Sequence, residues 1–147
     1  QVFNDVQLNG TAWMRTVQAF AILVGAGHIE PCLPAKDDSK RAASTRAFNA
    51  AVCKRAEDDG ELRFLASPVT GGGIAVDRLV QLFLTAHGAK NQDPISWIWS
   101  ILQSQGQRIV KDGHSLETEE QNLAHLRMVQ TDFAEKRLPL LKQLGIA

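Results

Sequence analysis

The sequence predicts a mainly helical α+β fold. A winged-helix-like N-terminal half with a β-hairpin wing, residues 1–88, would be followed by a helical C-terminal extension packed on it, residues 89–147. Three observations support this prediction. Apolar residues recur at helical spacing in several segments. Two short extended segments flank a loop rich in Pro and Gly, as in a β-hairpin. With 147 residues, of which 44% are hydrophobic, the chain can bury a core.

The first helix is expected to begin after Asn9-Gly10-Thr11 and to end at Gly25 or Gly27, since glycine commonly ends helices. Residues 28–31 should be extended, because Pro31 disfavours helix in the residue before it. The helical spacing predicts one buried face, which consists of Trp13, Val17, Phe20, Ala21 and Val24.

Residues 40–57 are rich in alanine and predict helix, with Thr45, Phe48, Val52 and Ala56 as the buried stripe. In a winged helix this stretch would supply the second and third helices, with a split near Ala42–Ser44. The segments 61–67 and 73–76 then predict the wing hairpin around the loop 68–72. Gly71 or Gly72 should have a positive φ, because the loop must reverse the chain.

Helix signals continue through the C-terminal half. Asp77 is expected to cap a helix that ends at Gly88, and Asp93-Pro94 to start one that Gly106 closes. Residues 107–110 predict a strand, and Thr118-x-x-Gln121 fits a capping box. The last long helix should run to about Lys136, where Pro139 breaks or kinks it. The expected inward residues of the three helices are Leu79, Leu82, Phe83, Ala86, Ile95, Ile98, Trp99, Leu102, Leu123, Leu126, Val129 and Phe133.

The balanced charge argues against a nucleic-acid partner. The 16 Lys and Arg residues equal the 16 Asp and Glu residues, whereas nucleic-acid binders usually carry a basic excess. No apolar run is long enough for a membrane helix, and no signal peptide is visible, so we expect a cytoplasmic protein without a membrane partner. Cys32 and Cys53 are too few for a disulfide framework and are expected to be reduced thiols.

Two glycine-rich segments resemble nucleotide loops, but neither has the flanking residues such a loop needs. After Gly25-Ala26-Gly27, the third glycine of a dinucleotide fingerprint is replaced by Glu30, and Pro31 prevents the helix that should hold the pyrophosphate. After Gly71-Gly72-Gly73, the Lys-Ser/Thr of a P-loop is missing. We therefore expect a helix end at the first segment and a hairpin tip at the second.

No residue pattern indicates a catalytic, cofactor or metal site. The four histidines, His28, His87, His114 and His125, are scattered, and none has metal-ligand spacing. The acidic residues Glu117, Glu119 and Glu120 fit the start of a helix, where the helix dipole favours negative charge. We therefore expect that this chain alone is not an enzyme.

Trp97 and Trp99 lie about 200° apart on the predicted helix, so both cannot face one core. One of them is expected to be exposed beside Ile95 or Ile101, as an anchor for another domain or chain. Partial burial of both under the C-terminal helix is the alternative.

One segment resembles a known family. Residues 63–76 read RFLASPVTGGGIAV and are followed by DRLVQLFL. This stretch is similar to the L-A-S-P-V-T-G-x-G segment of the predicted methyltransferase regulatory domain, found in the C-terminal part of bacterial S-adenosylmethionine-dependent methyltransferases. Weaker similarities are at residues 21–33, 46–52 and 137–146.

The resemblance implies a non-catalytic accessory or regulatory domain, which follows a methyltransferase domain that binds S-adenosylmethionine. That catalytic domain and its cofactor motif are not in this sequence, which starts at Gln1, so no site residue is carried over. The partners expected are the upstream methyltransferase domain, a second copy in a homodimer, or a protein substrate. The alternative function is a DNA-binding winged-helix transcription regulator.

Overall fold

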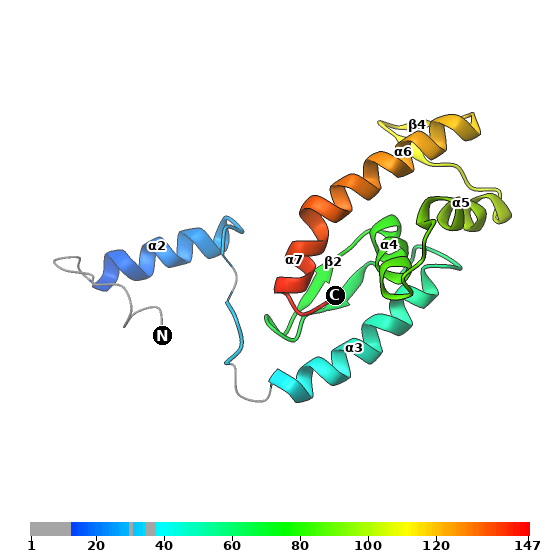
Figure 1. Ribbon diagram of the computed structural model, residues 1–147. Helices are drawn as coiled ribbons and strands as arrows, with labels where there is room; N and C mark the ends of the chain where they lie inside the picture. Colours follow the sequence, from blue (N-terminus) through cyan, green and yellow to red (C-terminus); the bar gives the residue numbers. More distant parts are fainter. Residues whose placement is uncertain (1–12, 30, 35–37) are drawn as a thin grey trace. The chain divides into compact units, whose positions relative to one another are not determined.

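The computed structural model describes residues 13–29, 31–34 and 38–147 (Figure 1). The chain forms two compact units, residues 1–32 and residues 33–147. The boundary expected at residue 88 stays a prediction. No helix in the described part of the chain is long and apolar enough to cross a membrane.

The first unit contains helix α2, Trp13–Gly25. The helix ends as predicted, because Gly27 has a φ of +71° and His28 donates its amide to the Leu23 carbonyl oxygen. The expected cap at Asn9–Thr11 lies outside the described residues. The prediction of a buried face is wrong: Trp13, Val17 and Val24 are all exposed. Within this unit α2 is the one helix described, so no second described element covers that face.

The second unit is α+β and mainly helical, as the sequence predicts. Its elements in chain order are α3 (Asp38–Arg55), β1 (Phe64–Ala66), β2 (Gly73–Ala75), α4 (Arg78–Gly88), α5 (Pro94–Ser104), β3 (Val110–Lys111), β4 (His114–Ser115), α6 (Glu119–Asp132), η1 (Phe133–Arg137) and α7 (Leu138–Gln143).

The expected winged-helix order is not confirmed. Helix α3 is continuous from Asp38 to Arg55, so the predicted split near Ala42–Ser44 is wrong. The reason is compositional, because this stretch contains no Gly or Pro and is rich in alanine, the best helix former. None of the described residues of 28–31 is in a strand.

The predicted hairpin is present but short. Strands β1 and β2 pair antiparallel, with Phe64 opposite Ala75 and Ala66 opposite Gly73. The second hairpin pairs Val110 with Ser115 through β3 and β4. It lies slightly later than the strand predicted at 107–110.

Helix α4 is the centre of the core. It contacts α3, α5, α6 and η1, and Figure 1 shows it between α3 and the long C-terminal helical run. Residues 80–83 and Ala86 are buried, so the helix is covered over most of its circumference. The core continues on both sides of residue 88, through Val52 of α3, Ile98 of α5 and Leu126 of α6.

The predicted caps are confirmed. The Asp77 side chain accepts from the Val80 amide, and the Asp93 side chain accepts from the Ser96 amide. Thr118 and Gln121 form the predicted capping box at the start of α6.

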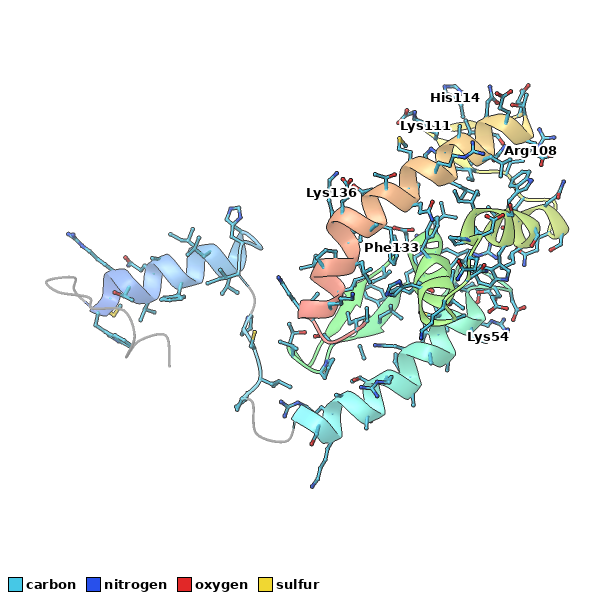
Figure 2. All side chains as sticks on the ribbon, viewed as in Figure 1. Lys54, Arg108, Lys111, His114, Phe133 and Lys136 are labelled. Carbon is cyan, nitrogen blue, oxygen red and sulfur yellow. The ribbon has the colours of Figure 1, made fainter. Side chains whose placement is uncertain are left out.

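The last helix does not break at Pro139 but changes its winding before it. Over η1 the helix is a π-helix, in which the Leu138 amide donates to the Phe133 carbonyl oxygen five residues earlier. Proline in a helix lacks an amide and clashes with the carbonyl four residues before it, and the wider turn accommodates this. Phe133 points into the core and stacks on Phe83, with ring centroids 5.6 Å apart, whereas Lys136 points outward (Figure 2).

Candidate functional site

The loop between β1 and β2, which carries the resemblance, is a structural junction organised by Ser67. This side chain is almost fully buried, and its Oγ donates to the Leu144 carbonyl oxygen at 2.8 Å. The same Oγ accepts from the amides of Val69 and Thr70, at 3.2 and 3.1 Å. One hydroxyl therefore holds the loop closed and binds it to the C-terminal end of α7.

The loop amides donate to acceptors within the loop, which argues against a phosphate-binding role. Besides Val69 and Thr70, Gly71 donates to the Ser67 carbonyl oxygen, and Gly72 donates to Thr70 Oγ1. A phosphate cradle instead needs amides that converge on an external anion. Gly71 has a φ of +75°, as predicted for the hairpin tip.

The segment that enters the second unit binds to the same loop. The Leu33 amide donates to the Val69 carbonyl oxygen at 2.8 Å. The Arg41 guanidinium donates to the carbonyl oxygens of Pro34 and Pro68, at 2.7 and 3.1 Å. Arg41 thus joins α3, the entering segment and the loop.

Beside this junction lies an open groove of about 480 Å³ with an apolar rim. Phe48 of α3 and Phe64 of β1 line it and are 54% and 61% exposed. Leu33 lines it too and is exposed. The sequence predicts Phe48 to be buried, but the covered side of helix α3 carries Thr45, which is half-buried, and Asn49 and Val52, which are buried, and Phe48 lies beside that side. Two large aromatic side chains are therefore left on one surface.

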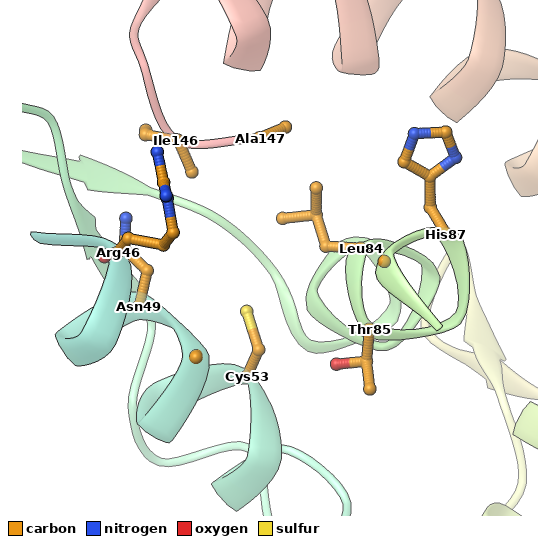
Figure 3. Close-up of a pocket in the computed structure, with 10 residues that line it drawn as sticks. Arg46, Asn49, Cys53, Leu84, Thr85, His87, Ile146 and Ala147 are labelled. Atoms are coloured by element: carbon orange, nitrogen blue, oxygen red, sulfur yellow. The ribbon is translucent and has the colours of Figure 1, made fainter. Parts of the chain in front are cut away.

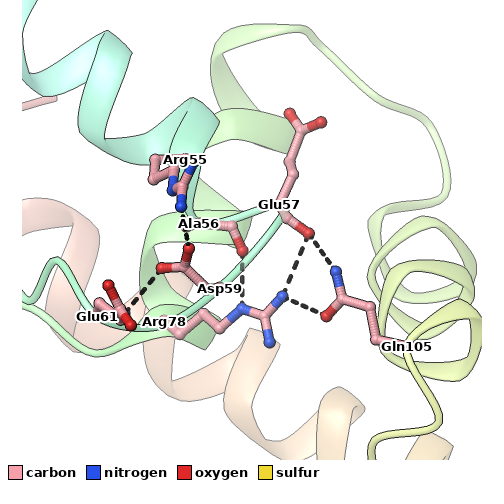
Figure 4. A network of polar contacts seen from close by, with 7 residues as sticks. All are labelled: Arg55, Ala56, Glu57, Asp59, Glu61, Arg78 and Gln105. Carbon is pink, nitrogen blue, oxygen red and sulfur yellow. Dashed lines mark hydrogen bonds and ion pairs between the residues drawn. The ribbon is translucent and has the colours of Figure 1, made fainter.

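A polar network joins the end of α3 to the end of α5 (Figure 4). Arg78 Nε donates to the Ala56 carbonyl oxygen at 2.7 Å, and Nη2 donates to the Glu57 carbonyl oxygen at 3.2 Å. The guanidinium also donates to the side-chain oxygens of Gln105 and Gln107. Gln105 itself donates to the Glu57 carbonyl oxygen. Arg78 thus satisfies carbonyls at the end of α3, a structural task.

A second cavity, of about 340 Å³, lies between α3 and α4 (Figure 3). The thiol of Cys53 points into it. Burial raises the pKa of this thiol to about 11, so it is protonated at neutral pH and is a poor nucleophile.

The structure does not bring the histidines and glutamates together. His87 is in the last turn of α4, His114 in β4 and His125 in α6, while His28 belongs to the first unit. Glu117, Glu119 and Glu120 are exposed at the start of α6. Among the described residues no cluster of His, Cys, Asp and Glu could hold a metal ion.

The expectation that one of Trp97 and Trp99 is exposed is wrong. Both are partly buried and pack against the core. The reason is that Ile98, which is fully buried, points directly inward. Trp97 and Trp99 each lie about 100° from Ile98 around the helix, so each packs along one side of the buried Ile98 side chain.

Sequence reasoning missed three buried side-chain amides, those of Asn49, Gln81 and Asn122. Each binds backbone groups from another segment: Asn49 binds Ala66, Gln81 binds Leu62 and Val76, and Asn122 binds Ile109 and Leu116. The sequence does contain a signal for their burial, because each of these residues is adjacent in sequence to apolar residues of the buried helix face. A buried polar group must find a hydrogen-bond partner.

The comparisons with known proteins identify one much longer relative. The chain is 43% identical over 143 residues, 97% of its length, to the uncharacterized protein sll1526 of Synechocystis sp.. It spans 28% of the length of that relative. No family model matches the chain, and no solved structure matches it.

Proposed function

We propose that this chain is a non-catalytic accessory domain of a larger S-adenosylmethionine-dependent methyltransferase, and that it binds the methyltransferase domain through the groove beside Phe48 and Phe64. The exposed aromatic pair carries the proposal. Soluble proteins seldom leave contiguous apolar surface uncovered, and aromatic residues are enriched where interfaces gain most of their binding energy.

Two further observations favour this occupant over a second copy of the chain. The relative is more than three times as long as the matched region, so a chain of this kind occurs joined to further sequence. The segment around Ser67–Gly73, which forms one wall of the groove, is also the segment that resembles the regulatory domain of methyltransferases. The resemblance suggests that the partner is a methyltransferase domain, and the groove suggests which surface binds it.

The test uses the remaining part of the natural polypeptide, expressed separately. Binding to the 147-residue chain is measured by calorimetry, first for the unchanged chain and then for a Phe48→Ser/Phe64→Ser variant. The loss of two aromatic anchors should weaken binding by more than about thirtyfold. The matched control is Val110→Ser/Met128→Ser, which removes two exposed apolar side chains outside the groove and should leave binding unchanged.

Sedimentation of the same variants distinguishes the other occupants. If the unchanged chain self-associates and the double serine variant does not, the groove binds a second copy and the proposed occupant is wrong. If the serine variant keeps its circular dichroism spectrum and binds the remaining polypeptide as before, the groove is not the interface.

The observations disfavour the DNA-binding alternative. Arg41 binds backbone carbonyls, Lys54 pairs with Glu57, and Arg55 pairs with Asp59. The hairpin loop contains no Lys or Arg, although a DNA-binding wing needs basic side chains that contact the phosphates. A salt-resistant, sequence-selective gel shift would revive this alternative.

We further propose that the domain works in the cytoplasm. Both cysteines are thiols, Cys32 exposed and Cys53 buried, and the cytoplasm keeps thiols reduced. Fractionation of cells that express the full natural polypeptide tests this placement.

A further inference from the structure

We propose that the cavity between α3 and α4 binds a small molecule with an aromatic or branched apolar body and an acidic group, which pairs with Arg46. This cavity shares no lining residue with the Phe48–Phe64 groove. The proposal is therefore independent of the proposed function, and it can fail or hold separately.

One face of α3 forms the first wall. Arg46, Asn49, Ala50 and Cys53 lie at positions i, i+3, i+4 and i+7, which share one side of a helix. Leu84, Thr85, His87 and Gly88 of α4 form the opposite wall, and Ile146 and Ala147 cross between the two (Figure 3). The cavity is thus a slot between two helices with the C-terminal segment along one side.

Two small residues in the walls leave room for the slot. Ala50 projects only a methyl group from α3, and Gly88 projects none from α4. A Cβ placed on Gly88 would meet no atom within 4 Å. Larger side chains at these two positions would fill the space, whereas the neighbouring core is closely packed around Val52 and Phe83.

The polar groups in the interior walls are already satisfied. The Asn49 amide binds both backbone groups of Ala66, and Thr85 Oγ1 donates to the Gln81 carbonyl oxygen at 3.1 Å. The Cys53 thiol is neutral, because burial raises its pKa. A ligand in the middle of the slot would therefore meet apolar groups and a neutral thiol, which favours an apolar body.

The volume indicates the size of that body. An apolar cavity of roughly 150 Å³ holds benzene, and ligand sites commonly enclose roughly 300–1,000 Å³. At about 340 Å³, the slot has room for a molecule of two fused rings with a third ring linked to them.

The charge of the rim indicates the acidic group. Arg46 and His87 stand at opposite sides of the slot in Figure 3, and none of the described residues that line it is Asp or Glu. A guanidinium donates two parallel hydrogen bonds to a carboxylate or sulfonate, and these charge-assisted bonds are stronger than neutral ones. The ligand should therefore place its acidic group at Arg46 and its rings between Ala50 and Leu84.

The test is a fluorescence titration of the full chain with two probes. One is 1-anilinonaphthalene-8-sulfonate, an aromatic anion, and the other is N-phenyl-1-naphthylamine, its uncharged counterpart. Ala50→Trp fills the slot and should abolish saturable binding of both probes. The matched control is Ala51→Trp, because Ala51 is exposed on the same helix and does not line the slot. This control should bind both probes like the unchanged chain.

A third variant tests Arg46 alone. Arg46→Gln should weaken binding of the sulfonate about tenfold and change binding of the uncharged probe less than about twofold. Equal effects of Ala50→Trp and Ala51→Trp, with circular dichroism unchanged, would show that the probes bind elsewhere and would overturn the site. An unchanged sulfonate affinity in Arg46→Gln would overturn the assignment of an acidic ligand.

Cys53 provides an independent readout within the slot. In a Cys32→Ser background, N-ethylmaleimide can react at Cys53 alone, because the chain contains two cysteines. Saturating sulfonate probe should slow this reaction, since the thiol points into the slot. Unaltered labelling of Cys53 while the probe is bound contradicts the proposal.

Discussion

At the scale of single residues, Gly71 shows how closely the hairpin tip and the entering segment fit together. Its φ of +75° is unfavourable for any side chain, and a Cβ there would lie 2.6 Å from the Leu33 Cδ1 atom. Gly71→Ala should therefore lower the free energy of unfolding by about 1–3 kcal/mol, through backbone strain and displacement of Leu33.

Urea denaturation measures this change, and Gly72→Ala is its control. Gly72 has an ordinary φ, and a Cβ there would meet only Thr70 Oγ1, at 3.8 Å. The control should alter the free energy of unfolding by less than about 0.5 kcal/mol. Equal effects at the two positions would show that the fit to Leu33 contributes nothing.

Cys53 should make stability depend on pH in the alkaline range. Burial raises its pKa from 9.0 to about 11 in the folded chain. Between these values the unfolded chain releases the proton and the folded chain retains it, so unfolding becomes more favourable as pH rises. At pH 11 the loss should approach about 2–3 kcal/mol, and below pH 8 it should be absent. Denaturation of the unchanged chain and of Cys53→Ala at pH 8 to 11 measures it, and a parallel pH dependence in both would contradict the assignment.

At the scale of elements, the Arg78 network determines how the end of α3 meets α4 and α5. Arg78→Lys keeps the charge but removes the planar guanidinium, which donates to carbonyls of Ala56 and Glu57 and to two glutamine side chains. We expect a loss of about 1–3 kcal/mol in the free energy of unfolding, because carbonyls at the helix end lose their donors. The control, Arg108→Lys at an exposed position, should be neutral in the same thermal or urea unfolding experiment.

The sequence predicts most elements because their ends carry local signals. Asp77, Asp93, Thr118 and Gly27 act within a few residues of their own position, and all four do what the pattern predicts. The features that the sequence predicts wrongly depend on contacts between residues that are far apart in the sequence. Phe48 is exposed because the covered side of α3 is the one that carries Thr45, Asn49 and Val52, and the burial of Trp97 and Trp99 depends on the direction of Ile98.

The candidate sites were less predictable for the same reason. The slot depends on two small lining residues, Ala50 of α3 and Gly88 of α4, and small residues carry no sequence signal of a cavity. The groove is lined by the predicted hairpin and by α3, and the sequence pattern does not show which side of α3 stays exposed.

At the scale of the whole molecule, the second unit should fold without the first. Among the described residues, every member of the buried core lies at residue 52 or later. A chain of residues 31–147 keeps Leu33 and its bond to Val69. It should therefore unfold cooperatively, with a midpoint close to that of the 147-residue chain. Calorimetric scans of both chains measure this, and a non-cooperative transition of the shorter chain would show that the first unit contributes to the core.

The amide of Asn49 also has a consequence for how this molecule behaves when concentrated. The backbone groups of Arg63 and Ser67 form hydrogen bonds across the hairpin, with Val76 and Gly72. The N–H and C=O of Ala66 therefore face the opposite edge of β1. Asn49 occupies both of those groups, at 2.7 and 2.9 Å. An open strand edge is a template on which other chains add strands and aggregate. The Asn49 side chain therefore prevents another chain from pairing with β1 at Ala66. This protection matters here because Phe48 and Phe64 are exposed on the same surface and favour association.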